Sequence, residues 1–112
     1  MAIHFETTTP VRLRNAFKKA IDDGHVVTWS YDEDGDFTHT AAQWVKKAWL
    51  RPSITKDERL SLFILPPNEG EISSEVYAIY HGRFIEAMLR HCDSLFTEAK
   101  ASAMPEDDDN VG

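Results

Sequence analysis

The sequence contains one cysteine, Cys92, among its 112 residues, and this scarcity excludes an internal disulfide. It also lacks any apolar run close to the roughly 18 residues that a membrane-spanning helix needs. The first ten residues, MAIHFETTTP, contain neither the basic segment nor the apolar segment of a secretory signal. We therefore expect a cytoplasmic protein with no membrane partner.

Motifs that carry chemistry are also missing. The chain has no P-loop, no GxGxxG turn and no GxSxG elbow. Its five histidines lack the close spacing of an HExxH zinc site, and Cys92 has no second cysteine to share a metal. Asp32, Asp34 and Asp36 alternate as an EF-hand loop begins, but the glycine and closing glutamate of that loop are not in place. We interpret them as an acidic hairpin turn and predict no catalytic residue, no metal site and no cofactor.

Positive charge is scarce as well. The chain has 12 basic and 19 acidic residues, which gives a net charge of −7. The Glu-Asp-Asp-Asp run at 106–109 supplies four of the acids, which leaves 15 acidic against 12 basic residues, a net charge of −3, in the remainder. Because phosphate neutralisation needs clustered lysine and arginine, we do not expect a nucleic-acid partner. We interpret one basic surface as solvated, with docking of an acidic partner as the alternative; it comprises Arg12, Arg14, Lys18 and Lys19.

The length and composition are those of a single domain, with 42% hydrophobic and 28% charged residues. From Ala101 onward the sequence reads ASAMPEDDDNVG, which offers little apolar surface to offset the entropy of ordering. We predict one α+β domain over residues 1–100 and a disordered acidic tail over residues 101–112.

A helix is predicted to begin at Thr9-Pro10, since threonine is a capping residue and proline suits the first helical position. Gly24 is expected to end this helix in the left-handed conformation. Residues 25–31 alternate between apolar and polar side chains, which predicts a half-buried strand.

Two hairpin registers are open after this strand. A two-residue turn would place Phe37 opposite an aspartate, whereas a three-residue loop ending at Gly35 would pair Tyr31 with Phe37 and Trp29 with His39. We favour the second register because it matches apolar side chains across the strands.

The next segment predicts a short helical turn and a second hairpin. Thr40 to Gln43 has the form of a capping box. Residues 49–54 and 59–65 are predicted to be extended, with a turn at residues 55–58 between them. Pairing Leu50 with Ile64 brings apolar side chains together and leaves Pro52 at an edge or a bulge.

Residues 73–96 predict one long helix capped by Ser73 or Ser74. The segment from Val76 to His81 is apolar nearly all round, which is typical of a segment that is buried on both sides or lies in an interface. Gly82 is unfavourable inside a helix and indicates either a close approach of another backbone or a break. The alternative is that residues 75–81 form a strand.

These patterns predict an α+β fold. It has an N-terminal helix, a small antiparallel meander of about four strands with a short inserted helical turn, and a long C-terminal helix packed on one face of the sheet.

The leading functional hypothesis is a small non-catalytic binding protein that acts through a protein partner or as a homodimer. Its predicted interface comprises Val76, Ile79 and Tyr80. The alternative is a small enzyme or small-molecule binder whose pocket gathers a histidine, tyrosine and arginine set: His39, Arg51, Tyr80, His81 and Arg83. His81 has two interpretations, because a buried imidazole must hydrogen-bond: it is bonded to a backbone carbonyl or a tyrosine, or it forms the base of this pocket.

Overall fold

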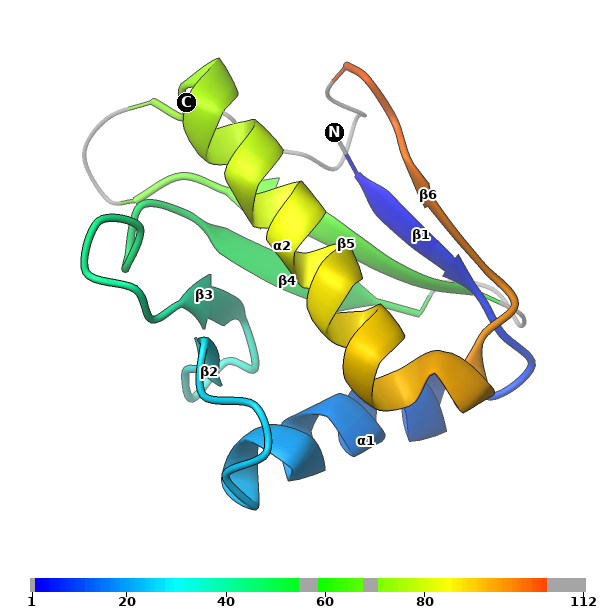
Figure 1. Ribbon diagram of the computed structural model, residues 1–112. Helices are drawn as coiled ribbons and strands as arrows, with labels where there is room; N and C mark the ends of the chain where they lie inside the picture. Colours follow the sequence, from blue (N-terminus) through cyan, green and yellow to red (C-terminus); the bar gives the residue numbers. More distant parts are fainter. Residues whose placement is uncertain (1, 55–58, 68–70, 105–112) are drawn as a thin grey trace.

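The computed structural model describes residues 2–54, 59–67 and 71–104 (Figure 1). Within these ranges the chain forms one six-stranded antiparallel sheet and two α-helices, so the predicted α+β class is confirmed. The elements in chain order are β1 (Ile3–Glu6), α1 (Pro10–Asp22), β2 (Trp29–Tyr31), β3 (Phe37–His39), β4 (Trp49–Ser53), β5 (Arg59–Leu65), α2 (Ser74–Cys92), the short 3-10 helix η1 (Asp93–Leu95) and β6 (Glu98–Ala101).

The strands lie in the order β2-β3-β4-β5-β1-β6. Every pairing is antiparallel, so β1 and β4 run parallel with β5 between them, and β5 and β6 run parallel with β1 between them. Without the β2–β3 hairpin, the chain is therefore two interlocked split β-α-β units. The hairpin is an insertion between α1 and β4, and one residue pair, Phe37 with Leu50, joins it to β4.

The predicted four-strand meander and N-terminal helix are wrong in detail, because β1 and the edge strand β6 were not anticipated. β1 precedes the first helix and lies between β5 and β6, where Ile3 is opposite both Leu62 and Ala101. Ala101, the first residue of the predicted tail, thus belongs to the sheet. Residues 105–112 of that tail and the predicted turn at residues 55–58 lie outside the described residues.

The first hairpin has the register favoured above: Tyr31 is opposite Phe37 and Trp29 is opposite His39. Gly35 has a φ of +82°, which supplies the left-handed residue that the loop requires. The strand is shorter than predicted, however. The backbone amides of residues 25 and 26 bond the Ala20 carbonyl at the end of α1, so this stretch closes the helix instead of extending β2.

Residues 41–47 form turns rather than a regular helix. The backbone amides of Trp44 and Val45 both bond the carbonyl of Ala41. The Thr40 hydroxyl donates to the carbonyl of Val27 instead of capping a helix. The connection to β4 is therefore held against the start of the hairpin.

The long helix α2 is confirmed, and the alternative strand at residues 75–81 is wrong. The Ser73 hydroxyl caps the helix by accepting a hydrogen bond from the Val76 amide. In Figure 1, α2 runs diagonally over the sheet, and α1 lies near its C-terminal end. Neither described helix has the length and apolar character that crossing a bilayer requires.

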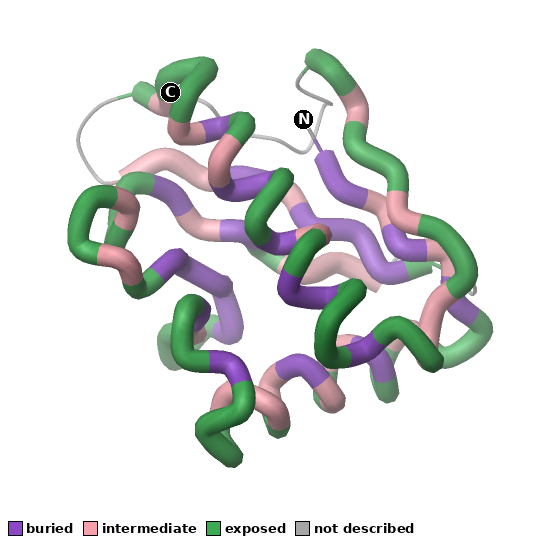
Figure 2. Tube along the Cα trace, in the orientation of Figure 1, coloured by how far each residue is buried: buried purple, intermediate pink, exposed green. Residues whose placement is uncertain are grey.

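A single core lies between the helices and the sheet. Figure 2 shows buried stretches along the central strands beneath α2, whereas β6 is mostly exposed. Phe84 lies at the centre of the aromatic part of this core, with ring centroids at 5.0 Å from Phe17, 5.1 Å from Trp29 and 5.5 Å from Phe37.

Gly82 is an exposed residue inside α2, and no other backbone approaches it. A Cβ built at this position meets no atom within 4 Å, so the expectation of a close backbone contact is wrong. We predict that Gly82→Ala raises the free energy of unfolding by about 0.5–1 kcal/mol, because alanine loses less backbone entropy in a helix. Urea denaturation measures the change. Gly24→Ala is the matched control and should destabilise the fold, because Gly24 has a φ of +79°; equal effects of both variants would contradict the prediction.

Candidate functional site

A pocket of about 190 Å³ lies where the β2–β3 hairpin, the turn at residues 41–44 and α2 meet. The three segments are separate in the sequence, and the insertion of the hairpin beside α2 brings them together (Figure 1). The residues that line the pocket are Thr28, Trp29, His39, Ala41, Gln43, Trp44, Arg83 and Glu86.

His39 has a fixed orientation in this pocket. Its Nδ1 accepts a hydrogen bond of 3.1 Å from the backbone amide of Ala41, so Nδ1 carries no proton. In the neutral ring the proton is therefore on Nε2, which bonds none of the residues that the structure describes. The ring also contacts Trp29 edge-on at 5.1 Å between centroids. His39 thus offers the pocket one oriented N–H donor.

The charges around this donor come from α2. Burial, followed by the positive charge of Arg83, lowers the pKa of His39 below its ordinary value of 6.5. The Arg83 side chain is 54% exposed and has one loose ion pair of 3.7 Å with Glu86. At neutral pH the pocket therefore holds a neutral imidazole beside a guanidinium and a carboxylate.

The lowered pKa of His39 predicts a loss of stability in acid. An unfolded chain protonates this ring near pH 6.5, whereas the folded chain does so only at lower pH, so the unfolded state binds more protons in that window. The contribution of the neutral His39 ring to the free energy of unfolding is fully present above pH 6.5 and is lost as the pH falls towards the lowered pKa. NMR titration of the His39 ring should give a midpoint below 6.5, and His39→Gln should reduce the destabilisation between about pH 7 and pH 5. A midpoint at or above 6.5 would contradict this prediction.

Tyr80 supports the pocket from behind. Its side chain is fully buried, and its ring packs against Trp29 at 5.6 Å and His39 at 6.3 Å. Its hydroxyl donates a short hydrogen bond to the carbonyl of Trp44 and lies 3.1 Å from the Thr38 hydroxyl. Tyr80 therefore ties α2 to the turn that carries Trp44.

The structure brings together only part of the predicted pocket set. His39 and Arg83 line the pocket and Tyr80 lies behind it, whereas the other two residues lie elsewhere. His81 is buried, and its Nδ1 is 2.6 Å from the Tyr77 carbonyl, so the interpretation as a core histidine bonded to a backbone carbonyl is confirmed. Arg51 forms a bidentate pair with Asp36 at 2.8 and 3.0 Å.

The predicted set lacked six of the lining residues: Thr28, Trp29, Ala41, Gln43, Trp44 and Glu86. Trp29 was expected as the strand partner of His39. Gln43 and Trp44 had been placed in a helical turn, and nothing in that pattern indicated that the turn would lie against α2.

The predicted interface on α2 is largely covered by the chain itself. Tyr80 is in the core, and Val76 is half-buried and packs against it. Ile79 is also half-buried. Tyr80 contacts both the sheet, at Thr38 of β3, and the Trp44 turn.

The three aspartates of the first hairpin have their side-chain oxygens within 4.8 Å of one another. Asp32 Oδ1 accepts hydrogen bonds of 3.0 Å from the amides of Asp34 and Asp36. Both carboxylate oxygens of Asp36 are engaged by Arg51. The cluster therefore builds the hairpin loop, as interpreted from the sequence.

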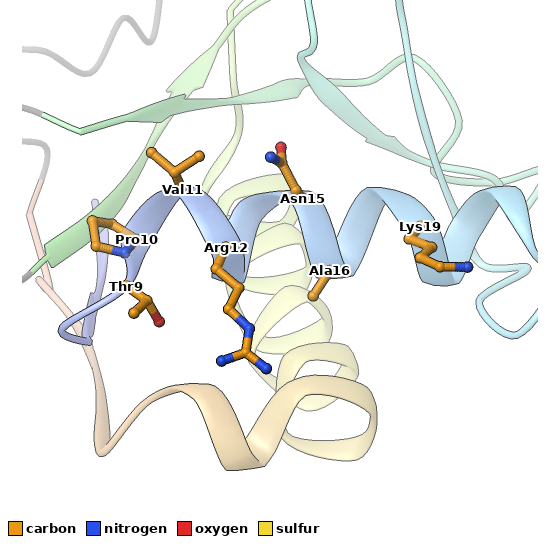
Figure 3. Close-up of a pocket in the computed structure, with 7 residues that line it drawn as sticks. All are labelled: Thr9, Pro10, Val11, Arg12, Asn15, Ala16 and Lys19. Carbon is orange, nitrogen blue, oxygen red and sulfur yellow. The ribbon is translucent and has the colours of Figure 1, made fainter.

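A larger hollow of about 710 Å³ follows the outer surface of α1 (Figure 3). Arg12 and Ala16 point to one side of this helix, and Val11 and Asn15 point to the other. All of its lining residues belong to α1 or its cap, so it is a shallow trough on one helix. A second hollow of about 360 Å³ adjoins it at Thr9 and Arg12.

Cys92 is buried on α2. Burial, and then the neighbouring Asp93 carboxylate, raise the pKa of its thiol. The thiol therefore stays protonated at neutral pH and is a poor nucleophile.

Comparison with known proteins gives no relative for this chain: no protein-family model, no curated protein and no solved structure matches it. The function must therefore follow from the geometry of its own residues.

Proposed function

We propose that the protein is a non-catalytic binding protein that docks a protein partner over the β2–β3 hairpin and α2, and that the pocket receives one side chain of that partner. The observation that carries the proposal is where the exposed apolar side chains lie in the sequence. Five large hydrophobic side chains are exposed among the described residues, and three of them lie within three positions of a residue that lines the pocket: Val27, Val45 and Leu89.

These three residues belong to, or directly adjoin, all three segments that form the pocket. Val27 precedes Thr28, Val45 follows Trp44, and Leu89 lies one helical turn beyond Glu86. We take these three residues as the rim of the pocket, because exposed apolar side chains beside a tryptophan-containing hollow have the composition of an interface hot spot. This proposed contact surface differs from the interface predicted at Val76, Ile79 and Tyr80.

The size and chemistry of the pocket support binding over catalysis. Pockets for cofactors and drug-sized ligands measure about 300–1,000 Å³, so a hollow of about 190 Å³ suits a single side chain. Thr28 supplies the one hydroxyl among the lining residues, and none of the described contacts joins it to His39. A nucleophile paired with a base is thus not assembled among the described residues of the pocket.

The test is a double variant of the rim, Val27→Asp/Val45→Asp. We expect it to remain folded, because both side chains are exposed, and to lose at least tenfold in partner affinity, since charges would enter an apolar contact (roughly 1.4 kcal/mol or more). Light scattering over a concentration series measures self-association. Quantitative affinity capture from extracts of the source cells measures other partners.

The control is Met104→Asp, because Met104 is 73% exposed and Val27 is 72% exposed, but Met104 is not near the pocket residues in sequence. The rim variant must lose a dimer or a captured protein that wild type and Met104→Asp both retain. If all three proteins have the same oligomeric state and capture the same proteins, the proposal is wrong.

A further inference from the structure

We infer that the partner's anchoring group is the carboxylate of an aspartate or glutamate side chain, held by the Arg83 guanidinium and the Nε2–H of His39. This inference rests on the proposed function and names the chemistry of the same pocket. Both donors line the hollow and come from different elements, Arg83 from α2 and His39 from β3.

The orientation of His39 decides between an acidic and a basic anchor. Because the Ala41 amide donates to Nδ1, the other ring nitrogen presents a hydrogen, and this nitrogen bonds none of the described residues. A lysine or arginine side chain carries hydrogen-bond donors only, so it could not form a hydrogen bond with this N–H group. A carboxylate carries acceptors only and would meet it correctly.

The charge near His39 also favours an acidic anchor over a basic one. The positive charge of Arg83 acts on the His39 ring, and Glu86, which also lines the pocket, is paired with Arg83. Glu86 contacts Arg83 at 3.7 Å, which is longer than the bidentate contacts of a well-formed arginine pair, and both side chains are more than half exposed. An incoming carboxylate can therefore replace Glu86 on the guanidinium.

The setting favours a side chain of a protein over a free acid. Trp29 and Trp44 supply apolar walls for the methylene part of an acidic side chain, and the exposed valines of the rim would contact the surrounding surface of the partner. A free acid would use the two donors but would leave the rim uncovered.

The experiment uses the full chain and a model ligand, N-acetyl-glutamate amide, with N-acetyl-glutamine amide as its uncharged match. NMR follows the ring signals of His39 and the side-chain Nε–H of Arg83 during titration. We expect saturable shifts with the glutamate compound and none with the glutamine compound. Arg83→Gln should weaken binding about tenfold, since it removes the charged contact, and Glu86→Gln should tighten binding about two- to threefold by removing a competitor.

The matched control is Arg90→Gln, an exposed arginine of α2 that does not line the pocket, and its affinity should equal that of wild type. Equal shifts with both model ligands, undiminished binding by Arg83→Gln, or no saturation up to about 0.1 M glutamate compound would each overturn the inference. Tighter binding of sodium acetate than of the blocked glutamate would reassign the pocket to a free acid. Each of these results is independent of the rim variants, which alone test the docking of a partner.

Discussion

Replacing Phe84 with alanine is expected to lower the free energy of unfolding by about 3–5 kcal/mol, which is the usual cost of removing a buried phenylalanine. The Phe84 ring joins four elements of the core. It packs against rings from β1, α1, β2 and β3, namely Phe5, Phe17, Trp29 and Phe37. Because domains of this size are stable by about 5–15 kcal/mol, the variant should be close to unfolding at room temperature.

Urea denaturation followed by tryptophan fluorescence measures this loss, since Trp29 lies in the same cluster. Phe63→Ala is the matched control. Phe63 lies on β5 but is only half-buried, and its ring contacts His4 at 6.2 Å between centroids. Its removal should cost about 1–2 kcal/mol. A loss as large as that of Phe84→Ala would show that the aromatic cluster is not the centre of stability.

Local patterns in the sequence predicted the elements that local contacts build. The register of the first hairpin followed from matching Tyr31 with Phe37 and from a glycine in the loop, and both features are present in the structure. The pairing of Leu50 with Ile64 and the cap of α2 at Ser73 were also predicted, because each depends on residues close together in the chain.

Strands β1 and β6 depend on contacts between distant parts of the chain and could not be predicted from periodicity alone. With four residues, β1 is too short to show a convincing alternation of apolar and polar side chains. They become a strand because β5 on one side and β6 on the other supply hydrogen-bonding partners. Glu98–Ala101 in turn has little β propensity, and its pairing with β1 outweighs this local preference.

The candidate pocket was only partly predictable for a similar reason. His39 and Arg83 could be named as polar residues of interest, but the sequence did not show what would lie between them. The residues that lie between them depend on the path of the turn at residues 41–47. Two hydrogen bonds between distant segments set this path: Thr40 to Val27 and Tyr80 to Trp44. Without that path, Trp44 could not be assigned to the pocket, and Tyr80 could be taken for an interface residue.

Tyr80→Phe should lower the free energy of unfolding by about 1–3 kcal/mol and also weaken ligand binding in the pocket. The substitution keeps the buried ring but removes the hydroxyl that bonds the Trp44 carbonyl and contacts Thr38. The Trp44 carbonyl would then lack its partner from α2, and the turn that forms one wall of the pocket would be held less firmly. We therefore expect weaker binding of N-acetyl-glutamate amide together with the loss of stability.

The matched control lies one turn earlier on the same helix. Tyr77 is also buried, but its hydroxyl has no hydrogen-bond partner among the described residues. Tyr77→Phe removes a buried polar group that makes no bond, so it should leave stability unchanged or raise it slightly, and ligand binding should not change. Urea denaturation and NMR titration of both variants compare the same chemical change at two buried sites. If both variants lose equal stability, the Tyr80 hydroxyl does not hold the Trp44 turn; if only Tyr80→Phe loses stability and binding, the inserted hairpin and α2 form one coupled site.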